Sequence, residues 1–196
     1  MDKIKIMLVE DDPFWQRVLA EDLAGEPDFA LTHVASTKEE ACSFAEQAEV
    51  DVVLMDLNLT EDRLDGLEAA RELKLRIGRD MKIIMLTSLQ EKEIVVKSFQ
   101  SGANNYITKS SYRDIVQAIR DAHAGRPVLH PDAVPALVEE IRMIQLTPSE
   151  RELYELREKG YTRSQISAAL NKSLNTVKTQ LRSIREKLLS DKREGS

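Results

Sequence analysis

The chain has 196 residues, 42% of them hydrophobic and 32% charged, which is enough for one or two domains with their own cores and excludes intrinsic disorder. No apolar run approaches the roughly 20 residues of a transmembrane helix, and no signal segment precedes the first strand, so we expect no membrane contact. A single cysteine, Cys42, excludes an internal disulfide and favours a reducing, cytoplasmic compartment.

Charge is unevenly distributed along the chain. The net charge is −6, yet residues 145–196 carry 11 Lys and Arg against 7 Asp and Glu, so this last quarter is basic on an otherwise acidic protein. A basic segment of this kind predicts a polyanionic partner for that quarter alone.

Short apolar runs alternate with amphipathic segments over the first two thirds of the chain. The predicted strands are Lys3–Val9, Phe29–Ala35, Asp51–Asp56, Lys82–Thr87 and Tyr106–Thr108. The predicted helices begin at Asp12-Pro13, at a capping box Ser36–Glu39, and at about Gly66, Glu91 and Tyr112, the last ending at Ala124. Alternation at this spacing predicts an α/β domain over residues 1–124, with a doubly wound, five-stranded parallel sheet.

A different pattern follows. Residues 125–145 form a proline-punctuated linker, in which we expect a short helix at Asp132–Met143. Residues 146–196 predict a small all-α domain: a capping box at Thr147–Glu150 opens one helix, Thr162 caps a second, and a third runs from Leu174 to Leu189. Two helices joined by a tight turn are the helix-turn-helix unit, whose second helix enters the DNA major groove.

The third of these helices has two distinct faces. Its apolar positions are spaced as a core stripe, namely Val177, Leu181, Ile184 and Leu188. The other face and its flank carry polar and basic residues, which are Asn175, Lys178, Thr179 and Arg182. We therefore expect these four residues to contact double-stranded DNA.

Polar side chains follow the strands of the predicted sheet at their carboxyl ends. They are Glu10, Asp11, Asp56, Thr87 and Lys109. Ligands of open α/β sheets bind at that edge, so these groups converge on one site centred on Asp56. Clustered carboxylates repel one another unless a cation lies among them, and Mg²⁺ suits oxygen ligands together with phosphate. An aspartate beside Mg²⁺ can attack a phosphoryl group, with Lys109 and the Thr87 hydroxyl binding the phosphoryl oxygens.

At these residues the segment 1–124 resembles the receiver domain of two-component response regulators, which has a flavodoxin-like fold. The matching motifs are Glu10-Asp11, Asp56, Thr87-Ser88 and Thr108-Lys109-Ser110. The resemblance implies that Asp56 accepts a phosphoryl group from a sensor histidine kinase. It also implies that Asp11 and the Asn58 backbone carbonyl bind Mg²⁺ with Asp56, that Glu10 acts on the metal through water, and that Thr87 and Tyr106 switch conformation.

Residues 146–188 are similar to the LuxR-type helix-turn-helix domain of the NarL/FixJ subfamily. The stretches that carry this similarity are Leu146–Glu152 and Asn175–Lys178, continuing to Lys187-Leu188. Together, the two resemblances imply a phosphorylation-controlled transcription regulator rather than an enzyme.

Three features depart from the family pattern. The loop Leu57–Gly66 is longer than usual and lacks its proline, and Lys172 occupies a position that is usually apolar. The segment after Leu189 is short and polar where the family has a fourth, dimerising helix. We therefore expect a phosphorylation-dependent homodimer formed through the receiver.

Two alternatives remain at this stage. Asp56-Leu57-Asn58 loosely resembles the haloacid-dehalogenase phosphatases, which place a second aspartate as acid/base where this chain has Asn58. Alternatively, the C-terminal domain binds a protein, although the basic face at 178–182 suits phosphates better than an apolar partner.

Overall fold

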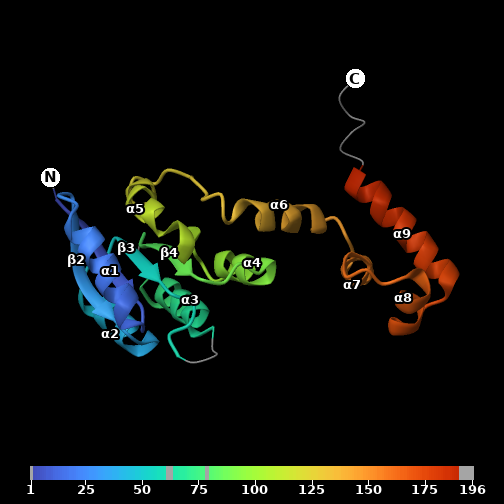
Figure 1. The fold of residues 1–196 in the computed structure, drawn as a ribbon, viewed down its shortest axis with the longest axis horizontal. Coiled ribbons are helices and arrows are strands. Elements are labelled where there is room, and N and C mark those ends of the chain that lie inside the picture. The colour runs from blue at the N-terminus through green and yellow to red at the C-terminus, as the bar shows by residue number, and fades with distance from the viewer. Residues whose placement is uncertain (1, 61–63, 78–79, 190–196) are drawn as a thin grey trace, which may run out of the picture. The chain divides into compact units, whose positions relative to one another are not determined.

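The computed structural model describes residues 2–60, 64–77 and 80–189 and divides into two compact units, Met1–Leu137 and Val138–Ser196. Each unit is described by itself (Figure 1). Part of the long loop, residues 61–63, and the polar stub 190–196 lie outside the described residues. Among the described helices, none is long and apolar enough to span a membrane.

The first unit is built on one parallel sheet. Its strands are β1 (Ile4–Val9), β2 (Phe29–Ala35), β3 (Val52–Met55), β4 (Lys82–Thr87) and β5 (Asn105–Thr108), in the order β2-β1-β3-β4-β5. Its helices are α1 (Pro13–Ala24), α2 (Lys38–Gln47), α3 (Asp65–Ile77), α4 (Lys92–Gln100), the 3₁₀ segment η1 (Lys109–Asp114) and α5 (Ile115–His123). The predicted doubly wound sheet is confirmed, and the strand order reverses between β1 and β3, which is where ligands bind in such sheets.

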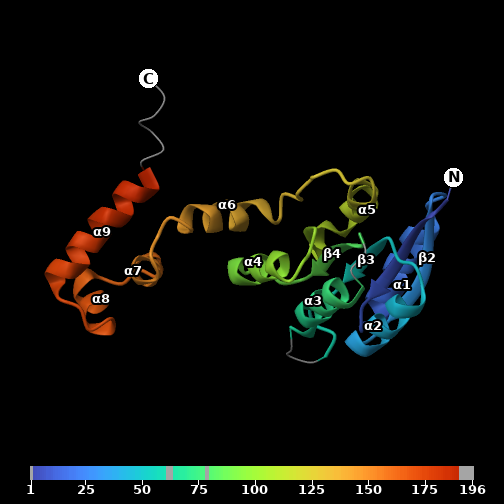
Figure 2. The ribbon, with the colours of Figure 1, turned by 180° about the vertical axis from the view of Figure 1, so that it is seen from behind.

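The two faces of the sheet bury separate cores. Even-numbered residues of β3, such as Leu54, pack with α1 and α5, whereas odd-numbered ones, such as Val53, pack with α2, α3 and α4. The helices accordingly cover both faces (Figures 1 and 2). Every residue of β3 is buried, which explains its uninterrupted apolar run.

Two helix starts differ from the sequence prediction. The cap of α2 is Thr37, whose hydroxyl accepts the Glu40 N–H at 3.2 Å, while the Glu40 carboxylate accepts the Ser36 N–H at 2.7 Å. The predicted box Ser36–Glu39 is therefore wrong by one residue, because Glu40 is the acid three residues after the cap. The last receiver helix was expected from Tyr112, but the chain forms the 3₁₀ segment η1 first and α5 begins at Ile115.

The connecting helix α6 (Val134–Met143) begins in the first unit and ends in the second. Ala133 and Ala136, which belong to the predicted linker 125–145, are buried in the core of the first unit. The linker is therefore not a free tether at its N-terminal half.

The second unit contains α7 (Pro148–Glu158), α8 (Arg163–Ala169) and α9 (Leu174–Leu189). Complete capping boxes, Thr147 with Glu150 and Thr162 with Gln165, begin α7 and α8. The small core includes Leu153, Ile166 and the predicted α9 stripe, of which Val177 and Ile184 are buried. Helix, turn and helix thus form as predicted.

Candidate functional site

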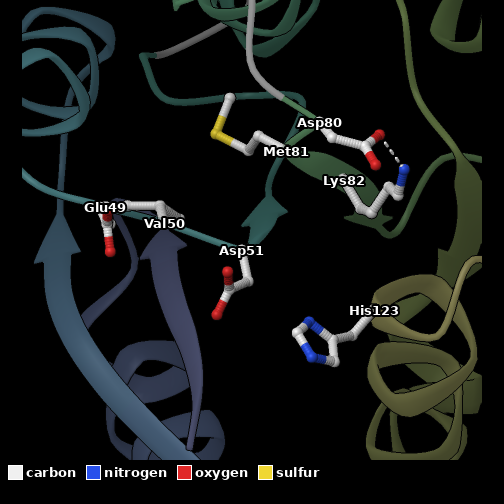
Figure 3. Close-up of a pocket in the computed structure, with 7 residues that line it drawn as sticks. All are labelled: Glu49, Val50, Asp51, Asp80, Met81, Lys82 and His123. Atoms are coloured by element: carbon white, nitrogen blue, oxygen red, sulfur yellow. Dashed lines mark hydrogen bonds and ion pairs between the residues drawn. The ribbon is translucent and has the colours of Figure 1, made fainter. Parts of the chain in front are cut away.

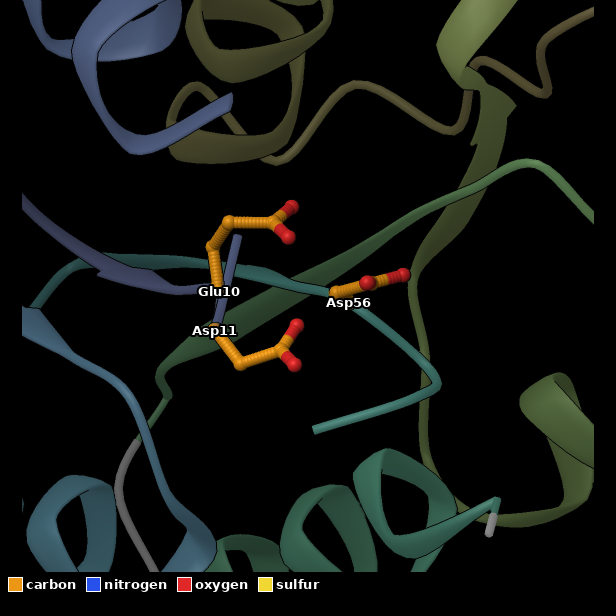
Figure 4. A group of neighbouring side chains, drawn as sticks. All are labelled: Glu10, Asp11 and Asp56. Atoms are coloured by element: carbon orange, nitrogen blue, oxygen red, sulfur yellow. The ribbon is translucent and has the colours of Figure 1, made fainter. Parts of the chain in front are cut away.

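Three carboxylates meet at the carboxyl ends of β1 and β3. Glu10 and Asp11 follow β1, and Asp56 follows β3. One oxygen of each lies within 4.8 Å of the others (Figure 4). Glu10 and Asp56 are buried, at 1% and 7% exposure, while Asp11 is exposed.

Lys109, which directly follows β5, is the cation of this cluster. Its ammonium Nζ lies 3.1 Å from Asp56 Oδ2 and 2.7 Å from Glu10 Oε2, and its side chain is buried. The approach to Glu10 Oε2 is an ion pair that is poorly aligned for a hydrogen bond, and no other donor among the described residues reaches that buried oxygen. One ammonium therefore pairs with two carboxylates of a cluster that holds three.

The charge imbalance shifts the acid–base equilibria of the site. Burial, followed by the neighbouring Asp56, raises the pKa of Glu10 to about 7 against the opposing attraction of Lys109. Burial also raises the pKa of Asp56, again against Lys109. Burial on its own would lower the pKa of Lys109, but the two carboxylates outweigh it and raise that pKa. The site holds more negative charge than its own lysine compensates.

The donor set fits a hard divalent cation. All three candidate ligands are carboxylates, and one buried oxygen of Glu10 has no aligned donor. Carboxylate oxygens are the ligands that Mg²⁺ takes. Asn58, whose backbone carbonyl is a predicted ligand, lies half-buried in the loop two residues after Asp56.

Thr87 and Tyr106 both bind the backbone of one residue, Leu89. The Thr87 hydroxyl accepts the Leu89 N–H at 3.2 Å, and the Tyr106 hydroxyl donates to the Leu89 carbonyl at 2.5 Å. Both side chains are buried, at 1% and 0% exposure. The two predicted switch residues are thus joined through the backbone of Leu89, a link that sequence reasoning did not anticipate.

The backbone at Asp56 is held by a close approach of α3. A Cβ built on Gly66 would lie 2.0 Å from the Asp56 carbonyl oxygen, so only glycine fits there. The neighbouring Asp65 accepts the Leu59 N–H at 2.9 Å and the Thr60 hydroxyl at 2.7 Å, which braces the loop after Asp56.

Trp15 is a site neighbour that sequence reasoning assigned only to an apolar stripe. Its ring centroid lies 5.3 Å from Lys109 Nζ, and the Tyr112 ring packs edge-on to it. The helix start at Asp12-Pro13 was the available signal, because it places the first turn of α1 beside the end of β1.

In the second unit, all four predicted DNA contacts are exposed on α9. Arg182 pairs with Glu186 one turn later, at 2.8 Å, and the Thr179 hydroxyl donates to the Asn175 carbonyl at 3.0 Å. Lys172, the departure in the turn before α9, is half-buried and donates to Ser149 and Gln180, so its charge is accommodated by polar partners.

A cavity of about 340 Å³ opens at the other, amino end of the strands (Figure 3). Its acids are engaged by neighbours: Asp51 accepts the Lys5 N–H, Glu49 pairs with the Lys5 ammonium, and Asp80 pairs with Lys82. Each of the three acids that line this cavity therefore has a hydrogen-bond or ion-pair partner.

A five-stranded doubly wound sheet with acids, a hydroxyl and a lysine at its carboxyl edge defines a receiver domain. The family model of the response regulator receiver domain matches residues 6–120, and that of sigma-70 region 4 matches residues 142–188. The chain belongs to the response regulators, with a LuxR-type helix-turn-helix domain after the receiver. The phosphatase alternative finds no support in these matches.

Several proteins resemble the chain over most of its length. Response regulator protein VraR of Staphylococcus epidermidis is 30% identical over 191 residues, covering 94% of this chain and 90% of VraR. A LuxR-family two-component response regulator from Aurantimonas sp. SI85-9A1 is 31% identical, with a TM-score of 0.64, over 71% of this chain and 98% of that one.

A more distant solved structure shares the fold alone. It is RcsB from Salmonella enterica serovar Typhimurium bound to a promoter in the presence of the phosphomimetic BeF₃⁻, which is 20% identical with a TM-score of 0.65. The match covers 95% of this chain and 92% of RcsB.

Proposed function

We propose that this response regulator, with its receiver at 1–124 and its DNA-binding domain at 146–196, controls transcription through phosphorylation of Asp56. The phosphoryl donor is a sensor histidine kinase, and Mg²⁺ is held by Asp11, Asp56 and the Asn58 carbonyl, with Glu10 acting through water. The observation that supports this most is the cluster of three carboxylates, two of which share Lys109 as their single cationic partner among the described residues.

In the transfer, a carboxylate oxygen of Asp56 attacks the phosphorus of the kinase phosphohistidine, a P–O bond forms, the P–N bond breaks, and the imidazole takes up a proton. Mg²⁺, when bound, supplies charge neutralisation and a Lewis acid for the phosphoryl oxygens. Lys109 pairs with the transferred group in place of Asp56. Thr87 exchanges its bond to Leu89 for a phosphoryl oxygen, which frees the Leu89 backbone that Tyr106 also holds.

The test is phosphate incorporation from acetyl phosphate with Mg²⁺. Asp56→Asn abolishes stoichiometric labelling, and Asp11→Asn removes its Mg²⁺ dependence, while Glu10→Gln is milder. Asp22→Asn, an exposed acid on α1, is the matched control and labels as the wild type does. Stoichiometric labelling of Asp56→Asn would show that the acceptor is a different residue.

The second part of the proposal concerns DNA. Asn175, Lys178, Thr179 and Arg182 are exposed together on α9, and the pair between Arg182 and Glu186 is a surface pair that phosphates can replace at little cost. Lys178→Ala and Arg182→Ala each weaken binding by about 1–3 kcal/mol. Lys159→Ala, an exposed lysine after α7, is the control. Unchanged affinity of both α9 variants in a salt titration would favour the protein-binding alternative.

Phosphorylation raises receiver dimerisation and operator affinity together, because paired half-sites need two domains. Sedimentation of the full-length protein with and without beryllofluoride measures this. A dimer fraction that does not change with beryllofluoride would contradict it. The cytoplasmic location stays a prediction from the lone Cys42.

A further inference from the structure

β5 is an edge strand whose outer side is closed by the linker. Among the described strands β5 pairs only with β4, at one end of the sheet order, so none of them covers its other edge. An open edge leaves main-chain N–H and C=O groups without partners. Here the chain segment 128–132, which follows α5, is held against β5 by hydrogen bonds between side chains and main-chain groups of the two segments.

Asn105, the first residue of β5, holds one end of this segment. Its side-chain oxygen accepts the His130 N–H at 2.9 Å, and its side-chain nitrogen donates to the Val128 carbonyl at 3.3 Å. Asn105 is 5% exposed, and both bonds are partly buried. The Asn105 side chain thereby binds the main chain of the linker to the start of β5.

Asp132 holds the other end at Thr108, the last residue of β5. Its Oδ2 accepts both the Thr108 N–H and the Thr108 hydroxyl, each at 2.8 Å. Partial burial raises the pKa of the Asp132 carboxyl, but these bonds outweigh it, and the pKa lies below its usual range. His130 supports the same corner: its Nδ1 accepts the Asp132 N–H at 3.2 Å, and its Nε2 lies 3.0 Å from Asp114.

These five residues, Asn105, Thr108, Val128, His130 and Asp132, form what we call the β5 clasp. On one side, Thr108 is bonded directly to Lys109, the cation of the phosphoacceptor site, and Tyr106 lies between the two anchors. On the other side, Ala133 is fully buried and α6 begins at Val134. The clasp therefore joins the strand end that carries Lys109 to the start of the inter-domain helix.

We propose that Asp132 is a positioning residue for Lys109, and that the β5 clasp carries the state of the Asp56 site to α6. A displacement of Lys109 toward a phosphoryl group moves Thr108. The two hydrogen bonds from Thr108 then move Asp132, which directly precedes the buried Ala133 and the start of α6. This inference rests on the proposed phosphorylation of Asp56.

The experiment uses full-length Asp132→Ala, Asp132→Asn and the control Asp22→Asn. Amide hydrogen exchange of Thr108 reports the clasp bond directly. The labelling rate with acetyl phosphate reports Lys109, and the ratio of DNA affinities with and without beryllofluoride reports coupling, on a duplex selected by the wild-type protein. Urea midpoints followed by Trp15, the only tryptophan, show that each variant is folded.

In Asp132→Ala, we expect faster Thr108 exchange, slower labelling and loss of most of the beryllofluoride response, which we take as about tenfold in the wild type. Asp132→Asn keeps an oxygen acceptor for Thr108 and restores labelling and coupling in part, at an unchanged urea midpoint. General loss of structure would not give this restoration.

Wild-type labelling and a wild-type beryllofluoride ratio in folded Asp132→Ala would overturn the inference. If Asp132→Ala does not fold, the test rests on Asp132→Asn. Fast Thr108 amide exchange in Asp132→Asn together with unchanged labelling and an unchanged beryllofluoride ratio would equally overturn the inference. Failure of the wild-type protein itself to accept phosphate would instead refute the proposed function, so the two failures are distinct.

Discussion

Glu10 and Glu150 are buried glutamates, at 1% and 6% exposure, in the first and second unit respectively, and their surroundings are opposite. Glu10 lies beside Asp56 and Asp11. Glu150 is surrounded by donors: it accepts the Thr147 N–H at 2.9 Å, the Ser183 hydroxyl at 2.8 Å and the Lys187 ammonium at 2.6 Å. The pKa of Glu10 is raised to about 7 by burial and Asp56, while bonds from Lys187 and Thr147 lower that of Glu150 to about 2.

The two glutamates differ in whether residues of their own unit compensate their charge. Glu150 is satisfied by residues of its own unit, and it ties the start of α7 to α9. Glu10 ionises only above about pH 7, because Lys109 does not fully offset burial and the charge of Asp56. A buried acid thus indicates a ligand where its charge is uncompensated, and not merely where it is buried.

The largest expected effect is on Glu150. Glu150→Ala removes the capping partner of Thr147 and the buried acceptor of the Ser183 hydroxyl and the Lys187 ammonium. We expect the free energy of unfolding of the second unit to fall by about 3 kcal/mol. Hydrogen exchange of α7 and α9 peptides during urea denaturation measures it. Glu152→Ala, an exposed glutamate on the same helix, is the control, and equal effects of the two would contradict the structural role of Glu150.

The opposite sign is expected for Glu10. In a buffer free of divalent cations at pH 8, Glu10→Gln removes a buried charge that is repelled by Asp56, and the first unit gains about 2 kcal/mol. Trp15 fluorescence during urea denaturation follows this unit. Glu21→Gln, on the exposed side of α1, is the control. Destabilisation of the first unit by Glu10→Gln would show that the pair with Lys109 outweighs the repulsion.

The two glutamates also predict opposite pH windows. Between about pH 4.5 and 7 the unfolded chain has released the Glu10 proton while the folded unit retains it, so stability falls as pH rises, by at most about 1.4 kcal/mol per pH unit. The contribution of Glu150 is complete above its usual pKa of 4.5 and is lost as pH falls toward about 2. Differences between wild type and each Glu→Gln variant, measured across pH, isolate these windows. If both glutamates changed the free energy of unfolding over the same pH range, the predicted difference between them would be wrong.

The smallest expected effect is that of Mg²⁺ on the stability of the two units. At ten times its dissociation constant, Mg²⁺ stabilises the first unit by about 1.4 kcal/mol and leaves the second unchanged. Asp11→Asn removes this stabilisation, and Asp22→Asn retains it. Equal stabilisation of both units by Mg²⁺ would indicate a general salt effect instead of a site.

The sequence by itself determined the elements and the edge at which the site residues gather. The run before Asp56 predicts a strand buried on both faces, and parallel strands must end at one edge, so Glu10, Thr87 and Lys109 converge there whatever their exact contacts. The sequence also predicts the Thr147 capping box and the apolar stripe that contains Val177, because caps and helix faces depend on residues three or four positions apart.

Only the tertiary structure decided which distant groups are paired. Asp132 meets Thr108 across 24 positions, and Lys187 meets Glu150 across 37. No local pattern specifies these pairs, because their distances depend on how whole elements pack. The same packing decides burial and the balance of charge, and through them it raises the pKa of Glu10 and lowers that of Glu150, which braces α7 against α9.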